Sequence, residues 1–246
     1  LDLKGQKMKK FEEIFKVKKP IIGILHLKGE TREERFERFK KEFEIYCNEG
    51  VDAVIVEDYF GPYSSMVDAL EYLKENGSPI PYGVNCLNFD MLGFRLAHKY
   101  GASFIQCDSV VGSVKPRDEE SLETFLTTYK EEYDVSVFGG VRFKYQPMLS
   151  VNSVEDDLRI AMKRAEAICV TETRTGEETS LSKIRQFKEV LNDFPLIVAA
   201  GVTLENIEKQ FVYADAAIIG SYFKDNSRDD GELSSENVRK LMDKVK

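Results

Sequence analysis

An apolar, often β-branched run followed by a helical pattern recurs eight times along the chain. The runs are PIIGILHL (20–27), DAVIVED (52–58), PYGVNCLN (81–88), ASFIQCD (102–108), DVSVFGGV (134–141), EAICVTE (166–172), PLIVAAGV (195–202) and DAAIIGS (215–221). Each run is too short and too continuously apolar for a strand with one solvated face, which is typical of parallel strands covered by helices. Eight such units in 246 residues predict an α/β fold, a single (β/α)8 TIM barrel. A doubly wound open sheet is the alternative, but eight units without an antiparallel edge fit closure better.

Helical patterns separate the runs. Thr31 and Glu34 form a capping box that begins the helix after the first run, and Gly50 ends that helix. Further helices are expected near 63–76, 90–100, 118–131, 153–164, 180–193 and 204–211. No composition break divides the chain, so residues 20–246 are predicted to form one barrel domain.

The first nineteen residues differ from the rest of the chain because they are rich in lysine. Phe11, Ile14 and Phe15 follow one another at helical spacing, which predicts a short amphipathic helix near 8–16. We interpret residues 1–19 as a basic helical extension that covers one end of the barrel. A membrane-surface role is the alternative, although the apolar face is brief.

Composition excludes several classes of protein. Apolar residues make up 42% of the chain, enough for a sizeable core, so a disordered chain is excluded. The net charge of −8 argues against a nucleic-acid-binding body, which needs a basic surface. No apolar run approaches the ~18 residues of a membrane span, and the N-terminus lacks the apolar segment of a signal peptide.

Cysteine and histidine usage limits the chemistry. None of the four cysteines is spaced as CxxC, and they are predicted to be buried and unpaired in a reduced, cytoplasmic protein; they are Cys47, Cys86, Cys107 and Cys169. His26 and His98 are the only histidines, so one chain cannot build a three-histidine zinc site, and a metal would depend on carboxylates.

Polar residues follow the apolar runs, at the strand ends where TIM barrels carry their sites. Alternation along the first strand places His26 on the inward side with Ile22 and Ile24. The other polar residues at strand ends are Glu57, Asp58, Asn85, Asn88, Asp90, Gln106, Asp108, Arg142 and Lys144. The candidate catalytic residues are His26, Glu57, Asn85, Asp108 and Lys144. The alternative is a satisfied polar layer at the top of the bore.

Several roles stay open for these groups. His26 or Glu57 could act as general acid or base, and Lys144 could form a Schiff base or neutralise a phosphate. Glu57, Asp58 and Asp90 are candidate ligands for Mg²⁺, although Asp58 and Asp90 could instead cap helices.

Small residues at the last two strands suggest a phosphate site. Gly201 and Thr203 follow the seventh run, and Gly220 and Ser221 end the eighth. Backbone N–H groups at such loops are the usual phosphate donors of this architecture, and the alternative is a tight turn. Thr175 and Gly176, after the sixth run, could add donors.

Taken together, KPIIGILHL, GVDAVIVEDYFG, PYGVNCLNFD, VTETRTGEETSL, AAGVTLENI and AAIIGSYFKD resemble the BtpA/SgcQ family over residues 19–240. This resemblance implies a TIM barrel with ribulose-phosphate-binding-like architecture. One branch of the family is named for a role in photosystem I assembly, and another is associated with sugar-metabolism operons. The segment GVRFKY (140–145) departs from the family's DVHVKH-like pattern, so that an acid and two histidines become Gly140, Arg142 and Tyr145.

Three functions remain open. The first is an enzyme of lyase, aldolase or isomerase type that acts on a small phosphorylated sugar or related metabolite. The second is an assembly or stability factor for a membrane complex, and the third is a binding barrel without catalysis. The expected partner is a small phosphorylated metabolite, and a homo-oligomer stays open.

Overall fold

The computed structural model describes residues 9–87, 89–112, 118–146 and 151–246. Its strands are β1 Ile21–Leu25, β2 Ala53–Glu57, β3 Tyr82–Asn85, β4 Phe104–Cys107, β5 Ser136–Gly140, β6 Ala167–Val170, β7 Leu196–Val198 and β8 Ala216–Ile219. The helices are α1 Phe11–Ile14, α2 Arg32–Asn48, α3 Tyr63–Asn76, α4 Asp90–Tyr100, α5 Glu119–Tyr133, α6 Val154–Ala161, α7 Leu181–Leu191, α8 Ile207–Gln210, the 3₁₀ turn η1 Ser221–Phe223 and α9 Ser235–Val245.

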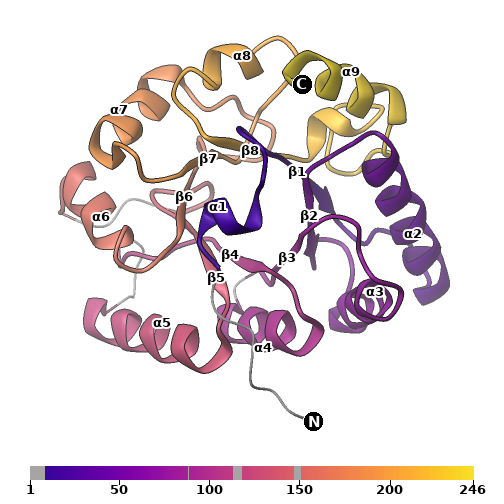
Figure 1. Ribbon diagram of the computed structural model, residues 1–246, viewed down its shortest axis with the longest axis horizontal. Coiled ribbons are helices and arrows are strands. Elements are labelled where there is room, and N and C mark those ends of the chain that lie inside the picture. Colours follow the sequence, from indigo (N-terminus) through magenta and orange to yellow (C-terminus); the bar gives the residue numbers. More distant parts are fainter. Residues whose placement is uncertain (1–8, 88, 113–117, 147–150) are drawn as a thin grey trace.

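The strands pair in parallel and in chain order, and β8 pairs with β1 to close the barrel. Figure 1 shows the strand ring surrounded by the helices. The predicted (β/α)8 TIM barrel is therefore confirmed, and the open sheet is excluded. Among the described helices, none combines the length and apolar character that a bilayer span requires.

Alternation along the strands sorts side chains into an inner and an outer core. The inner cluster fills the bore and includes Ile22, Ala53, Ile55, Phe104, Phe138, Ala167, Cys169, Ile197, Ala216 and Ile218. At its centre the Phe104 and Phe138 rings stack with centroids 4.3 Å apart. The outer cluster packs strands against helices. Because Gly23 has no side chain, the Tyr46 ring of α2 can lie directly against β1, and its hydroxyl donates to Ile24 O at 3.1 Å.

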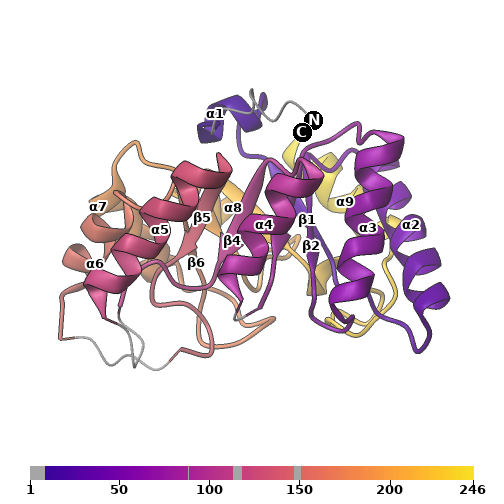
Figure 2. The same ribbon diagram turned by 90° about the horizontal axis from the view of Figure 1, so that it is seen from below.

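Helix α1 closes the N-terminal end of the barrel. Ile14 and Phe15 are buried, and the Phe15 ring packs against Phe104 and Phe138 near the starts of β4 and β5. Figure 2 shows α1 at one end of the barrel, opposite the loops that follow the strands. The predicted helix over 8–16 is too long: the helix covers only residues 11–14, and residue 8 lies outside the described residues. The helix ends before Phe15, whose backbone is extended although its ring packs in the bore.

Three of the four cysteines lie in the core. Cys86, Cys107 and Cys169 are buried as predicted, while Cys47 is half-buried, and none of the four is in a disulfide.

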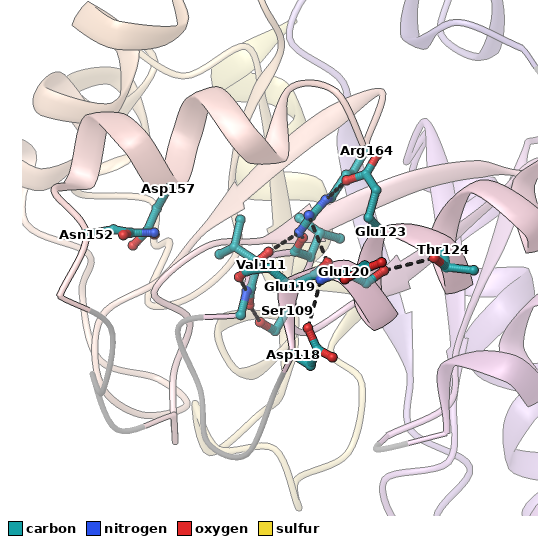
Figure 3. A network of polar contacts seen from close by, with 12 residues as sticks. Ser109, Val111, Asp118, Glu119, Glu120, Glu123, Thr124, Asn152, Asp157 and Arg164 are labelled. Atoms are coloured by element: carbon teal, nitrogen blue, oxygen red, sulfur yellow. Dashed lines mark hydrogen bonds and ion pairs between the residues drawn. The ribbon is translucent and has the colours of Figure 1, made fainter.

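In the network of Figure 3, the buried Arg164 guanidinium pairs with Glu119 at 2.7 Å and donates to Val110 O at 2.9 Å. Arg164 therefore ties the end of β4 to the start of α5.

Candidate functional site

A cavity of about 340 Å³ opens at the C-terminal ends of the strands. It brings together most of the candidate residues named from the sequence: His26, Glu57, Lys144, Thr175, Gly176, Gly201, Thr203, Gly220 and Ser221. Its apolar wall includes Ile24, Ala199 and Ile218. At the opposite end of the barrel, α1 packs against the side chains that fill the bore.

His26 and Glu57 lie side by side at the cavity floor, and each is only 6% exposed. Burial raises the pKa of Glu57 to about 7, with Asp108 and Asp58 adding to the rise and Lys144 opposing it. Burial also lowers the pKa of His26 to about 3, helped by the Lys224 charge. The His26 Nε2 to Glu57 Oε2 distance of 3.8 Å exceeds a hydrogen bond. Near neutral pH this pair is therefore a neutral imidazole beside a titrating carboxyl group, not an ion pair.

Other groups surround this pair. Glu57 and Asn85 occupy paired positions of β2 and β3, and Asn85 Nδ2 donates a long hydrogen bond of 3.5 Å to Glu57 Oε1. Asp108 follows β4 and is half-buried. The His26 Nδ1 and Gln106 Oε1 atoms are buried without a hydrogen-bond partner among the described residues. Unpaired buried polar atoms are costly, so the His26 atom, on a residue that lines the cavity, indicates a place for a ligand or water.

The end of β5 explains the unusual GVRFKY segment. A Cβ at Gly140 would collide with the Asp108 carbonyl oxygen, so the acid of the family pattern has no room here. Arg142, named from the sequence as a polar residue at a strand end, does not line the cavity, because β5 ends at Gly140 and Arg142 has a φ of +49°. Arg142 instead pairs with Asp157 of α6 at 3.0 Å, whereas Lys144 does line the cavity.

The loops after β6, β7 and β8 form the other side of the cavity. Gly201 has a φ of +63°, and a Cβ there would collide with the Glu177 carbonyl oxygen. Gly220 lies against the His26 ring, where a Cβ would have its nearest contact at 3.5 Å. Glycine is thus obligatory at Gly201 for the backbone, while at Gly220 it leaves open space above His26.

Contacts around Thr203 remove one of the backbone donors that were predicted for the phosphate site. The Thr203 N–H, which was expected to face an anion, donates to Asn206 Oδ1 at 2.8 Å. Asn206 Nδ2 in turn donates to Gly201 O at 2.8 Å, so this side chain holds the whole turn. Glu205 also lies on the cavity rim. Donors for an anion must therefore come from the other groups of these loops, near Gly201 and the Gly220–Ser221 corner.

The metal candidates do not converge. The described residues contain no group of three or more His, Cys, Asp or Glu side chains placed to hold a metal ion. Asp58 accepts from the Leu87 N–H at 2.8 Å, and Asp90 begins α4 outside the cavity lining. Asn88 lies outside the described residues. A Mg²⁺ site stays a prediction.

The sequence patterns missed four residues near the cavity: Tyr59, Tyr145, Ser227 and Asp229. The Tyr59 ring lies 5.1 Å from the His26 ring. Burial and a hydrogen bond with the Asp229 carboxylate raise the pKa of Tyr59 to about 12. The Tyr145 hydroxyl accepts from the Thr175 N–H at 3.0 Å, and Ser227 lines the cavity. Tyr145, Ser227 and Asp229 do not directly follow an apolar run, so the sequence does not mark them as strand-end residues. Tyr59 does follow such a run, two positions after Glu57.

Comparison with known proteins gives consistent results. The sequence profile of the BtpA family matches residues 17–246. The uncharacterized protein PF0860 of Pyrococcus furiosus is 29% identical, over 92% of this chain and 94% of its own length. The sgc region protein SgcQ of Escherichia coli is 22% identical, over 95% of this chain and 97% of its own length.

Solved structures support the fold alone. A structure described as native KDPGal has a TM-score of 0.63 at 16% identity, covering 92% of this chain and 94% of its own. The (S)-3-O-geranylgeranylglyceryl phosphate synthase of Thermoplasma acidophilum, solved in complex with its substrate sn-glycerol-1-phosphate, has a TM-score of 0.60 at 12% identity, covering 93% of each chain.

Proposed function

The chain belongs to the BtpA family, and on this premise we propose that it is an enzyme that acts on a small phosphorylated sugar or related metabolite. The reaction is of lyase, aldolase or isomerase type, in which a proton moves to or from carbon or oxygen. One observation carries the proposal: Glu57, whose pKa is raised to about 7, shares a single cavity with the glycine loops after β7 and β8.

Glu57 is the proton-transferring residue in this proposal. A carboxyl group with a pKa near 7 exists in both protonation states at neutral pH, so it can accept and return a proton in one cycle. His26 remains neutral beside it, because burial lowers its pKa to about 3, and it serves as a hydrogen-bonding group. Lys144, on the same cavity wall, neutralises charge that develops on the substrate.

The phosphate of the substrate is assigned to the corner formed by Gly201, Gly220 and Ser221. The absence of a side chain at Gly220 lets an anion approach the backbone of this corner, which lines the cavity. Two observations on related folds support this assignment: TIM barrels usually bind phosphate after their last two strands, and one similar fold is described with a phosphorylated substrate.

Phosphate binding and turnover test the proposal separately. Calorimetry with inorganic phosphate is expected to show binding to the wild type and to Gly220→Ala, but not to Gly220→Asp, which adds bulk and negative charge. Incubation with a panel of phosphorylated metabolites, followed by ³¹P NMR, is expected to reveal a conversion that Glu57→Gln slows by about 10²–10⁴. Binding without any conversion would instead identify a non-catalytic binding barrel, and no phosphate binding would contradict the proposal.

A further inference from the structure

Three aromatic rings adjoin one another beside the glycine corner of the cavity. The His26 ring lies next to Gly220, where a Cβ would be 3.5 Å from His26 Cε1. The Tyr59 ring, on a residue that also lines the cavity, lies 5.1 Å from the His26 ring. The Phe60 ring contacts both, with its centroid 4.8 Å from that of Tyr59 and 6.0 Å from that of His26. The contacts therefore run from Gly220 through His26 to Tyr59 and Phe60, which are called here the aromatic edge.

Phe60 is the outermost of these residues. It is 39% exposed, whereas Tyr59 is half-buried and His26 is buried. Because both of its ring neighbours line the cavity, the exposed Phe60 ring lies at the rim of that cavity. Covering exposed aromatic surface with a flat apolar group removes both surfaces from water, so the aromatic edge favours a ligand that carries such a group.

The loop after β2 carries both rings of the aromatic edge and is held from two sides. On the side of β1, the Phe60 N–H donates to His26 O at 3.2 Å. On the side of β3, Asp58 Oδ1 accepts from the Leu87 N–H at 2.8 Å. The backbone that presents the rings is therefore in place before a ligand binds, which lowers the cost of ordering this loop on binding.

The site has three regions of different chemistry. The glycine corner is assigned to a phosphate under the proposed function. Next to it, His26 Nδ1 is buried without a hydrogen-bond partner among the described residues, and Glu57 lies beside the same ring, so this region suits the hydroxyl groups of a sugar. The aromatic edge follows beyond His26.

We propose that the substrate is a nucleoside 5′-monophosphate, with its phosphate at the glycine corner, its ribose against His26 and its base stacked on the aromatic edge of Tyr59 and Phe60. This inference rests on the proposed function and narrows its substrate class, because a sugar phosphate without a base leaves the aromatic edge uncovered. Stacking on aromatic side chains uses the flat face that every base has, so the aromatic edge alone does not select one base.

Three ligands that share a ribose phosphate test the inference. Uridine 5′-monophosphate (UMP) carries a planar base, its 5,6-dihydro derivative carries a puckered ring with the same hydrogen-bonding groups, and ribose 5-phosphate carries no base. Calorimetry uses the Glu57→Gln background, in which turnover is expected to be slow. UMP is expected to bind about tenfold more tightly than ribose 5-phosphate, which is the effect of one stacked base. The dihydro derivative is expected to lose most of this gain, because its saturated ring does not stack flat.

Variants of the aromatic edge assign the effect to its exposed ring. Phe60→Leu keeps an apolar side chain but removes the ring, so it is expected to reduce the tenfold preference for UMP to about twofold. Phe89→Leu is the matched control, because it removes an exposed ring from the next loop, after β3, that does not line the cavity. It is expected to keep the full preference. Both variants are expected to bind inorganic phosphate as tightly as the background protein, which checks that the fold and the glycine corner are intact.

The outcomes separate this inference from the function on which it rests. Equal affinity for UMP and ribose 5-phosphate, equal affinity for UMP and its dihydro derivative, or an unchanged preference in Phe60→Leu would overturn the inference. In each of these cases the binding of ribose 5-phosphate and inorganic phosphate would leave the proposed function standing. If neither ribose 5-phosphate nor inorganic phosphate binds, both proposals are wrong.

Discussion

His26 Nε2 lies 3.8 Å from Glu57 Oε2, and burial moves the pKa values of these two groups in opposite directions. Both shifts favour the uncharged form, as expected for groups removed from water. Near neutral pH, Glu57 therefore titrates and His26 does not. The following predictions start from this pair and extend to the backbone and to the buried ion pair between Lys224 and Glu42.

Glu57 makes the stability of the fold depend on pH. Its pKa is raised from the usual 4.5 to about 7, so the folded protein holds the proton more tightly than the unfolded chain. Stability is therefore lost as pH rises from about 4.5 through 7. Because Gln does not titrate, Glu57→Gln is expected to gain on the order of 3 kcal/mol relative to wild type between pH 4.5 and 8. Urea unfolding at several pH values measures this difference. Glu155→Gln, at an exposed position of α6, is the control, and a similar gain there would contradict the prediction.

His26 is expected to remain neutral far below the usual range of histidine. Burial lowers its pKa to about 3, so stability is lost as pH falls from 6.5 toward 3, where the unfolded chain takes up a proton more readily. ¹⁵N-detected NMR of the imidazole nitrogens measures this directly. The chain has only two histidines, and His98→Gln assigns the signals. A His26 signal that titrates between pH 6 and 7 would show that the prediction is wrong.

Two glycines of the phosphate corner are expected to respond differently to the same substitution. Gly201→Ala places a Cβ at a φ of +63° and against the Glu177 carbonyl oxygen, so it should cost more than about 2 kcal/mol of stability. Gly220→Ala meets nothing closer than 3.5 Å and should change stability by less than about 1 kcal/mol. Thermal or urea unfolding of both variants is the measurement. Equal losses would mean that the corner is held by something other than backbone conformation.

Removing one partner of the buried ion pair between Lys224 and Glu42 is expected to destabilise the fold, whereas replacing both with apolar residues is expected to have a small effect. Glu42→Gln leaves the Lys224 ammonium buried without its carboxylate, at a cost of about 3–5 kcal/mol. The double variant Glu42→Leu with Lys224→Met removes both charges and should recover most of this loss. Urea unfolding of the single and double variants gives the comparison. A double variant as unstable as the single one would indicate that Lys224 acts through other contacts.

The barrel and its inward-facing polar residues could be predicted from the sequence, because both follow from local alternation. Ile22, Ile24 and His26 share one side of β1, and Glu57 continues the same side of β2. Arg142 shows where this reasoning ends: the strand stops at Gly140, and beyond it a positive φ redirects the chain. Side chains alternate between the two faces of a strand only where the strand keeps its hydrogen bonds to the neighbouring strands.

Asp229 could not be predicted for a different reason. Its segment has no apolar run, and the contacts of that segment are distant in sequence: Lys224 binds Glu42, which is 182 positions away along the chain. The sequence pattern also could not predict the length of α1, because the spacing of Phe11, Ile14 and Phe15 fits a longer helix equally well. In the structure the Phe15 ring packs against Phe104 and Phe138 although its backbone is extended, and the spacing of apolar residues does not reveal such a contact.

The plug that α1 places in the bore has a kinetic consequence. Phe11 and Phe15 pack with tilted rings against Phe138, so within the described part of the chain apolar side chains fill the axis at the strand starts, and a ligand would enter and leave at the strand ends. A reaction that splits one molecule into two would then release its fragments one after the other through that mouth. Such an enzyme would show ordered product inhibition, in which only the fragment that leaves last competes with the substrate.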